Sequence, residues 1–283
     1  MRPFLILQLR PETEAADDEF AAFLARGGLG DGEVRRIRVE SEPLPAALDP
    51  GDFAAVIVGG GPGCVSDPPA GRPEAEARAE AAVLSLLPEI VARDLPFLGC
   101  CSGIGLLAHH LGAEVSKRRY GEPVGPVSVR LTGAGREDPL TRAMPERFNV
   151  LVGHKEAVQA LPRGTVQLVE GAACPIQMIR AGRNVYATQF HPESGPDNFA
   201  LRIRIYRDRG YFAPADAGRL EAACRAVPTE ASADILRRFV ARYRAEPPLG
   251  RPGAAATGGA SAAAPREAPG ESPAGEVLAP RPR

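Results

Sequence analysis

Apolar and polar positions along the first hundred residues follow two alternating patterns. Short runs of apolar side chains are separated by longer stretches with helical patterning. Short apolar runs are typical of buried strands, and the longer stretches are typical of helices. The expected strands are residues 4–9, 34–39, 55–58 and 96–99, and the expected helices between them include 14–24 and 74–92. This alternation predicts parallel strands joined by helical crossovers.

The middle of the chain changes to short strand-like runs with little helix, at residues 127–131 and across 166–188. Within this region we expect strands at 174–177 and 185–188. A few antiparallel strands should therefore flank the parallel ones. The whole pattern predicts an α/β fold with a flavodoxin-like, mostly parallel sheet and helices on both faces. In such sheets, catalytic groups lie outside the carboxyl ends of the strands.

The last third of the chain has two compositions. Helical patterning over 198–206, 215–226 and 231–243 predicts a C-terminal helical extension. Apolar residues of 231–243 share one helix face, which we expect to pack against the sheet, with partner docking as the alternative. From 247 to 283 almost no large apolar side chain occurs, so burial cannot offset the entropy of ordering. We expect one domain over 1–246 and a disordered tail rich in Ala, Pro and Gly.

Composition restricts the function classes. Of 283 residues, 44% are hydrophobic and 24% charged, as in ordinary globular proteins. A net charge of −1 argues against a nucleic-acid surface. Apolar runs stay far below the roughly 20 residues of a membrane span, and residues 1–7 pass into a strand-like segment rather than a signal peptide. The five cysteines lack metal-ligand or disulfide spacing. We expect a cytoplasmic protein with reduced thiols, no metal and no membrane partner.

Cys101 has the surroundings of a catalytic nucleophile. It lies within Gly-Cys-Cys-Ser-Gly, residues 99–103, between two apolar runs. A sharp strand-to-helix turn with small flanking residues holds a side chain clear of the backbone. A thiol also needs a base, and Gln-Phe-His-Pro-Glu places His191 two residues before the carboxylate Glu193. Alone, a cysteine is more often an inert buried residue than a nucleophile, so the prediction depends on the joint pattern.

Together, these segments resemble the class I glutamine amidotransferases, which combine a Gly-x-Cys-x-Gly elbow with a downstream Phe-His-Pro-Glu. Gly-Gly-Gly-Pro-Gly at 59–63 follows an expected strand and resembles the glycine-rich loop of the family. That loop lacks the Gly-Lys-Ser/Thr end of a nucleotide-binding P-loop. Residues 152–158, followed by Leu161 and Pro162, resemble the His-x-Asp-x-Val-x-x-Leu-Pro stretch seen in the glutaminase part of GMP synthetases, with Glu156 in place of the usual aspartate.

The resemblance implies a reaction and roles for individual residues. Cys101 would attack the side-chain amide of glutamine, His191 would pass a proton to the departing ammonia, and Glu193 would hold the imidazole. The backbone amides of Gly61 and Ser102 would stabilise the oxyanion. The residues that the resemblance places around the substrate are Gly60, Gly105, Gly153 and His154. This chemistry needs no metal or organic cofactor.

Two departures from the family keep alternatives open. Family elbows commonly continue Cys-x-Gly-x-Gln, whereas this chain has Gly105 at the glutamine position. No Ser-Gly-Gly-x-Asp-Ser loop follows Glu193, so ammonia would either pass to a separate synthetase partner or be released. One alternative is a γ-glutamyl hydrolase that acts on a γ-glutamyl peptide or amine, with a pocket enlarged at Gly105. Another is a non-catalytic regulatory protein, against which the intact Cys101, His191 and Glu193 count. We expect a nearby arginine cluster (Arg202, Arg204, Arg207 and Arg209) to form a solvated face.

Overall fold

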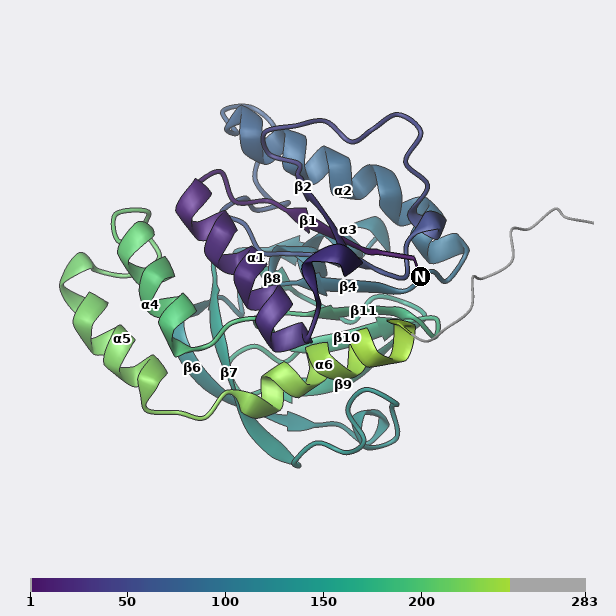
Figure 1. The fold of residues 1–283 in the computed structure, drawn as a ribbon. Helices are drawn as coiled ribbons and strands as arrows, with labels where there is room; N and C mark the ends of the chain where they lie inside the picture. The colour runs from purple at the N-terminus through teal and green to yellow at the C-terminus, as the bar shows by residue number, and fades with distance from the viewer. Residues whose placement is uncertain (1, 245–283) are drawn as a thin grey trace, which may run out of the picture. The chain divides into compact units, whose positions relative to one another are not determined.

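Five parallel strands form one half of a nine-stranded sheet in the computed structural model, which describes residues 2–244 (Figure 1). In sheet order they are β2 (Val34–Arg38), β1 (Phe4–Gln8), β3 (Val56–Val58), β4 (Phe97–Cys100) and β11 (Val185–Thr188). With β11 counted as the fifth parallel strand, this is the flavodoxin order 2-1-3-4-5. The α/β prediction is confirmed. The predicted disorder of 247–283 falls outside the described residues.

Antiparallel strands extend the same sheet beyond β11. They are β10 (Met178–Ala181), β9 (Thr165–Gly171), β6 (Glu122–Leu131) and β7 (Arg147–His154), in that order. A separate pair joins β5 (Val115–Ser116) to β8 (Ala157–Val158). The strand expected at 174–177 was wrong, because those residues form bends before β10. Pro175 has no N–H to donate to a strand ladder.

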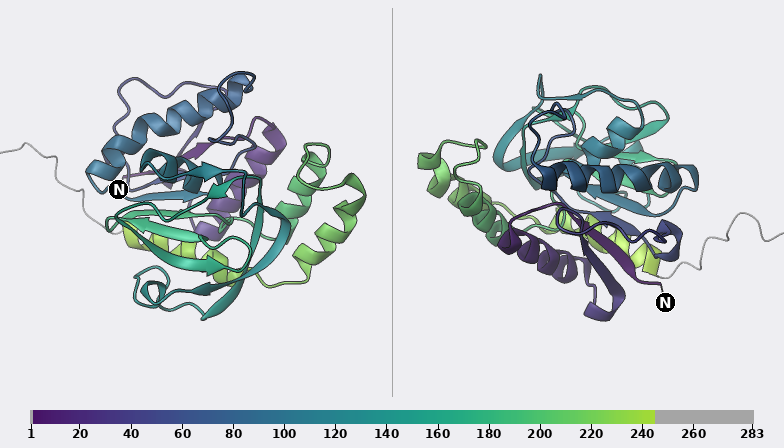
Figure 2. Two further views of the ribbon diagram at one scale, coloured as in Figure 1. Left: turned by 180° about the vertical axis from the view of Figure 1, so that it is seen from behind. Right: turned by 90° about the horizontal axis from the view of Figure 1, so that it is seen from above.

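Helices cover both faces of the sheet, as predicted (Figures 1 and 2). α1 (Thr13–Gly27) and α6 (Glu230–Arg244) pack on one face, in a core shared with Phe4 and Ile6. α2 (Glu74–Ala92) and α3 (Ser102–His110) pack on the other face, against Leu5 and Leu7. Successive β1 side chains thus point to opposite faces. The apolar face of α6 is buried against the sheet, as expected.

The C-terminal extension begins with two helices that pack on each other. α4 (Pro196–Ile205) and α5 (Ala217–Arg225) lie side by side, apart from α6 (Figure 1). They share a small core with β7, formed by Leu151, Phe199, Ile203, Leu220 and Cys224. Short 3₁₀ helices occur at Asp31–Glu33, Pro50–Asp52, Ala134–Arg136 and Pro214–Asp216. In the chain, α4 starts three residues after Glu193 and soon after the carboxyl end of β11.

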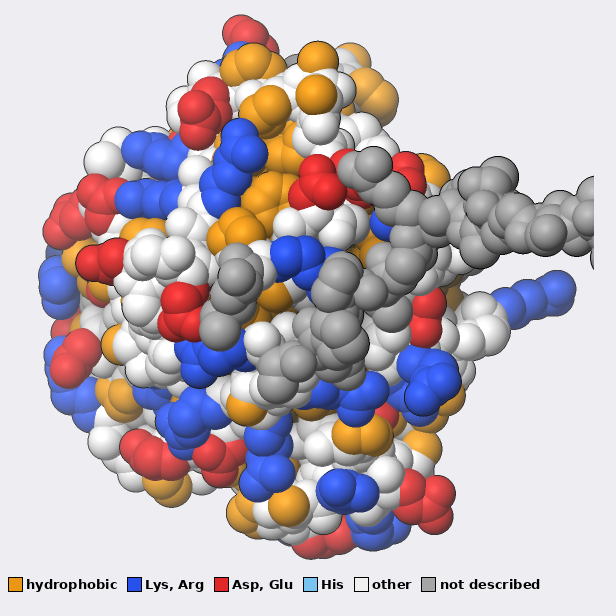
Figure 3. Space-filling model, turned by 45° about the vertical axis from the view of Figure 1, so that its right-hand side comes forward, with side chains coloured by type: hydrophobic (Ala, Val, Ile, Leu, Met, Phe, Trp, Pro, Cys, Tyr) orange, Lys and Arg blue, Asp and Glu red, His pale blue; other side chains and the backbone are white. Residues whose placement is uncertain are grey.

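The surface agrees with the nearly balanced charge of the chain. On the face in Figure 3, acidic and basic side chains are mixed with apolar ones. The described part of the chain contains no helix both long enough and apolar enough to cross a bilayer.

Candidate active site

Cys101 occupies the turn between β4 and α3. Its backbone has φ 54° and ψ −97°, a conformation that side chains other than glycine rarely adopt. Its amide donates a 2.8 Å hydrogen bond to the carbonyl of Thr188 on β11, which ties the turn to the sheet. A Cβ at Gly99 would stand 2.8 Å from the backbone of Gly103. The tight turn therefore requires glycine at 99, as the sequence pattern suggests.

His191 and Glu193 follow β11 and lie next to Cys101. The His191 Nδ1 is 2.7 Å from the Glu193 Oε1, and both side chains are buried. His191 also forms a hydrogen bond with Cys101. The structure thus brings together the three residues that the sequence marked as catalytic.

The electrostatics of this trio favour a thiolate and an imidazolium. Burial raises the pKa of Cys101, but the charge and hydrogen bond of His191 outweigh it, so the pKa is lowered overall. Burial lowers the pKa of His191, yet Glu193 and Cys101 raise it above its usual value. Burial instead raises the pKa of the neighbouring Cys100 well above the usual range. Of these two adjacent cysteines, only Cys101 therefore has a pKa shifted in favour of the thiolate.

The lowered pKa leads to a measurable expectation. Iodoacetamide should alkylate Cys101 with a pH midpoint below about 8.5, the value of a free thiol, because the thiolate persists at lower pH. His191→Asn should move the midpoint upward, since burial remains while the imidazolium charge is lost. Peptide mapping by mass spectrometry measures both. Labelling of Cys100, or an unchanged midpoint in His191→Asn, would contradict the pairing.

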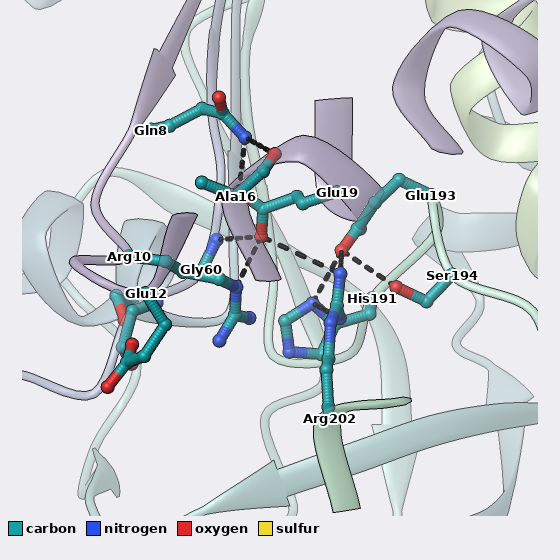
Figure 4. A network of polar contacts seen from close by, with 12 residues as sticks. Gln8, Arg10, Glu12, Ala16, Glu19, Gly60, His191, Glu193, Ser194 and Arg202 are labelled. Carbon is teal, nitrogen blue, oxygen red and sulfur yellow. Dashed lines mark hydrogen bonds and ion pairs between the residues drawn. The ribbon is translucent and has the colours of Figure 1, made fainter. Parts of the chain in front are cut away.

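A buried arginine supports the trio from α4 (Figure 4). The Arg202 Nη1 is 3.1 Å from His191 Nδ1, and its Nη2 donates to Glu193 Oε1 at 3.1 Å. The prediction of a solvated face was wrong for this residue, which is 5% exposed, although Arg204, Arg207 and Arg209 are exposed. Because Arg202 sits on the face of α4 that packs inward, its charge is directed at the carboxylate of Glu193.

Glu19 of α1 is a second buried carboxylate behind the trio (Figure 4). It accepts hydrogen bonds from Arg10 Nε at 2.8 Å and from the Gly60 amide at 3.2 Å, and it lies 3.7 Å from Arg202 Nη2. The two guanidinium groups of Arg10 and Arg202 therefore alternate with two carboxylates, those of Glu19 and Glu193, beside Cys101. Sequence reasoning missed Glu19 and Arg10. A lone carboxylate among the apolar residues of one helix face was the available signal for Glu19.

Gly60, which the sequence placed around the substrate, lies where three site residues converge. A Cβ there would stand 2.6 Å from His191 Cε1, 2.7 Å from Arg10 Nη2 and 3.5 Å from Cys101 Cβ. Gly60 does not line the cavities described below. Its missing side chain makes room for the base and the arginine.

The amide expected to hold the oxyanion already has a partner. The Gly61 N–H donates to Ser102 Oγ at 3.0 Å, and that hydroxyl donates to the Gly61 carbonyl at 3.1 Å. An oxyanion at Gly61 would have to replace the hydroxyl. The amide of Ser102 is at the first turn of α3, where amides lack helical partners.

A first cavity of about 340 Å³ opens on one side of Cys101, lined by Gly105, Gly153, His154 and Glu156 among others. The His154 ring is fixed, because Nδ1 donates to the Glu156 carbonyl at 2.8 Å and Nε2 lies 3.0 Å from Glu122 Oε2. Three residues expected at the substrate, Gly105, Gly153 and His154, thus line one cavity.

The space beside Gly105 is occupied. A Cβ there would stand 3.2 Å from Glu156 Oε1, and the Glu156 carboxylate accepts from the amides of Val65 at 3.0 Å and Ser66 at 2.9 Å. The missing glutamine side chain therefore leaves no enlarged pocket at this point, since Glu156 fills the volume.

A second cavity of about 420 Å³, including solvent at its mouth, opens on the other side of Cys101. Its lining includes His191, Arg10 and Arg202, with aromatic side chains from α4 and the segment after it. The two cavities share Gly61, Cys101, Gly153 and Tyr211. Cys101 therefore stands at their junction.

Two sets of buried side chains have metal-ligand atoms within 4.8 Å of one another: Glu122, His154 and Cys174, and Glu19, His191 and Glu193. Their described contacts already engage these atoms. In the first set, Cys174 Sγ donates to the Ile176 carbonyl at 3.6 Å, and Glu122 accepts from Gln177 at 2.7 Å. These hydrogen bonds account for the clustering without a metal ion.

Comparisons of sequence and fold relate this chain to known proteins. The family model "Glutamine amidotransferase class-I" matches residues 31–203, more than half of the chain. "GMP synthase [glutamine-hydrolyzing]" of Lactobacillus delbrueckii is 31% identical over 179 residues, covering 60% of this chain and 32% of that protein. The protein of that name from Thermosipho melanesiensis is 30% identical over 154 residues, covering 53% of this chain and 26% of its own length. The chain thus spans a quarter to a third of the length of these relatives.

A solved structure has the same fold. It is a glutamine amidotransferase from Thermotoga maritima, with a TM-score of 0.68 and 21% identity, and the match covers 87% of this chain and all of that one.

Proposed function

The chain belongs to the class-I glutamine amidotransferase family, and we propose that it hydrolyses the side-chain amide of glutamine to glutamate and ammonia. The observation that carries this proposal is the buried contact series from Cys101 to His191 to Glu193 at the strand-to-helix turn. These residues are the nucleophile, the general base and acid, and the carboxylate that orients the base.

In the first half of the reaction, the Cys101 thiolate attacks the amide carbon. Negative charge then develops on the carbonyl oxygen, which the amides of Gly61 and Ser102 stabilise once the Ser102 hydroxyl has moved aside. His191 gives its proton to the amide nitrogen, the C–N bond breaks, and ammonia leaves. A thioester with Cys101 remains.

In the second half, water attacks the thioester. His191, now neutral, takes a proton from this water, and the C–S bond breaks with the thiolate of Cys101 as the leaving group. Glu193 holds the proton of His191 on Nδ1 throughout, so Nε2 stays directed at the reacting atoms. Glutamate is released and the trio is restored.

We further propose that a separate synthetase receives the ammonia. The matched GMP synthases are named as glutamine-hydrolysing, and this chain matches only about a quarter to a third of their length. Their name pairs glutamine hydrolysis with a synthase activity, which is why we assign the ammonia to a synthetase.

The test is direct. The purified chain should release ammonia and glutamate from glutamine in equal amounts, without added metal or nucleotide. Asparagine, one methylene shorter, is the matched control substrate. Glutamine left intact by a folded protein whose Cys101 still reacts with iodoacetamide would reject the proposal.

The contact between Ser102 and Gly61 leads to another expectation. Ser102→Ala should raise kcat/KM for glutamine about two- to tenfold, because a competing hydrogen bond worth about 0.5–1.5 kcal/mol no longer occupies the oxyanion donor. Ser85→Ala, on the exposed face of α2, is the control and should have no effect. A fall in kcat/KM for Ser102→Ala would instead assign the hydroxyl to the oxyanion site.

A further inference from the structure

The second cavity is larger than the departing ammonia of glutamine requires. With the open solvent at each mouth included, the second cavity encloses about 420 Å³ and the first about 340 Å³. Its walls combine apolar and aromatic side chains, including Val124, Phe199, Tyr206 and Phe212, with the two arginines Arg10 and Arg202. Such a lining suits an organic group with an apolar body and a negative charge.

The position of His191 decides which end of a substrate would lie in the second cavity. His191 lines the second cavity and not the first. The imidazole must contact the leaving nitrogen in order to protonate it. The acyl part of the substrate therefore lies in the first cavity, beside His154 and Gly105, and whatever is attached to the nitrogen extends into the second.

Arg10 offers a free donor in this cavity. The residue is 5% exposed, with Nε donating to Glu19 and Nη1 donating to the Tyr206 hydroxyl at 3.2 Å. Among the residues the structure describes, no hydrogen bond engages Nη2. A Cβ placed on Gly60 would stand 2.7 Å from Arg10 Nη2 and 2.6 Å from His191 Cε1, so these two atoms lie close to each other. A carboxylate two bonds from a nitrogen at His191 would thus lie within reach of Nη2.

We propose that the second cavity is a leaving-amine subsite, and that the chain cleaves γ-glutamyl amino acids whose side chain is apolar or aromatic. This inference rests on the proposed function, because it uses the same nucleophile and base. Cys101 Sγ bonds to the γ-carbonyl carbon, the C–N bond breaks, and the proton of His191 goes to the departing amino acid. Water then cleaves the thioester to give glutamate. The α-carboxylate of the departing amino acid pairs with Arg10, and its side chain lies among the aromatic groups.

Three substrates test the subsite on the unmodified protein: glutamine, γ-glutamylphenylalanine and γ-glutamylphenethylamide. The last has the aromatic body without the carboxylate. We expect γ-glutamylphenylalanine to be cleaved with a kcat/KM at least equal to that of glutamine. The kcat/KM for γ-glutamylphenylalanine should exceed the kcat/KM for γ-glutamylphenethylamide by about tenfold or more, as expected for a hydrogen bond to a charged group. Released phenylalanine, phenethylamine and glutamate are measured by chromatography.

Two matched variants locate the effect. Val124→Phe narrows the second cavity and should lower kcat/KM for γ-glutamylphenylalanine at least tenfold more than that for glutamine. Val115→Phe narrows the first cavity, which both substrates use, and should lower the two values by similar factors. Circular dichroism and thermal melting check that both variants fold.

The outcomes separate this inference from the proposed function. Hydrolysis of glutamine alone, or an equal loss for both substrates in Val124→Phe, would overturn the subsite and leave the glutaminase. Hydrolysis of γ-glutamylphenylalanine alone would support the subsite and overturn the glutaminase. If the folded protein cleaves neither substrate, both proposals fail.

Discussion

Cys101→Ala is expected to abolish glutamine hydrolysis, with kcat/KM reduced by about 10⁴-fold or more, because no thioester can form without the sulfur. The strained turn and the hydrogen bond to His191 single out this thiol. Ammonia release from glutamine, measured at high enzyme concentration, gives the residual rate. The fold should persist, since alanine is small enough for the turn.

Cys100→Ala is the matched control, one residue away. Cys100 is buried in β4 with its pKa raised by burial, so its removal should cost some stability and leave most of the activity. A glutamine-analogue electrophile should label Cys101 in the unmodified protein and in Cys100→Ala. Labelling of Cys100 with Cys101 unmodified would overturn the assignment.

Glu193→Gln is expected to lower kcat/KM by about 10³- to 10⁴-fold, as when an orienting carboxylate becomes an amide with unchanged shape. The reason is the tautomer of His191. Arg202 Nη1 is already 3.1 Å from His191 Nδ1, so without the carboxylate both neighbours can donate to this nitrogen. The proton then moves to Nε2, where the ring can no longer accept one from Cys101.

The pH dependence of alkylation separates this effect from a loss of folding. In Glu193→Gln the midpoint for Cys101 should rise, because Glu193 is the largest contribution that raises the pKa of His191 and so stabilises the thiolate. Glu193→Asp should recover part of the activity. Glu89→Gln, on the exposed side of α2, is the control for loss of one carboxylate. Unchanged kcat/KM in Glu193→Gln would show that Glu193 does not set the tautomer of His191.

The parallel half of the fold could be predicted because each element carries its own local pattern. Strands buried on both faces are short apolar runs, and the helices between them are long enough to show periodicity. The strand prediction at 174–177 failed because it relied on the apolar residues there and gave too little weight to the turn-forming proline. Cys174 and Ile176 are buried there, but they flank Pro175 and belong to no strand.

The candidate site was predictable only where its residues are close in sequence. Cys101 lies in one motif, and His191 and Glu193 lie in another. Arg10, Glu19 and Arg202 come from three distant segments, and their roles depend on which face of each helix turns inward. Arg202 shows the limit, because its exposed neighbours in sequence, such as Arg204, have the same side-chain chemistry and no part in the site.

The space beside Gly105 could not be inferred from a single motif either. A missing side chain in one segment is matched by the carboxylate of Glu156 in another. Comparing sequences at position 105 reveals the missing glutamine side chain, but it does not reveal that Glu156 occupies the same space. Packing decides the shape of the first cavity.

The alternating charges of Arg10, Glu19, Arg202 and Glu193 also have a consequence for evolution. All four residues are at most 5% exposed, and removing one partner of a buried ion pair costs about 3–5 kcal/mol, a large part of a typical 5–15 kcal/mol of stability. Single replacements should therefore be eliminated by selection, and only paired exchanges should survive. Among homologous sequences, Arg10 and Glu19, which form the shortest of these ion pairs at 2.8 Å, should accordingly change together.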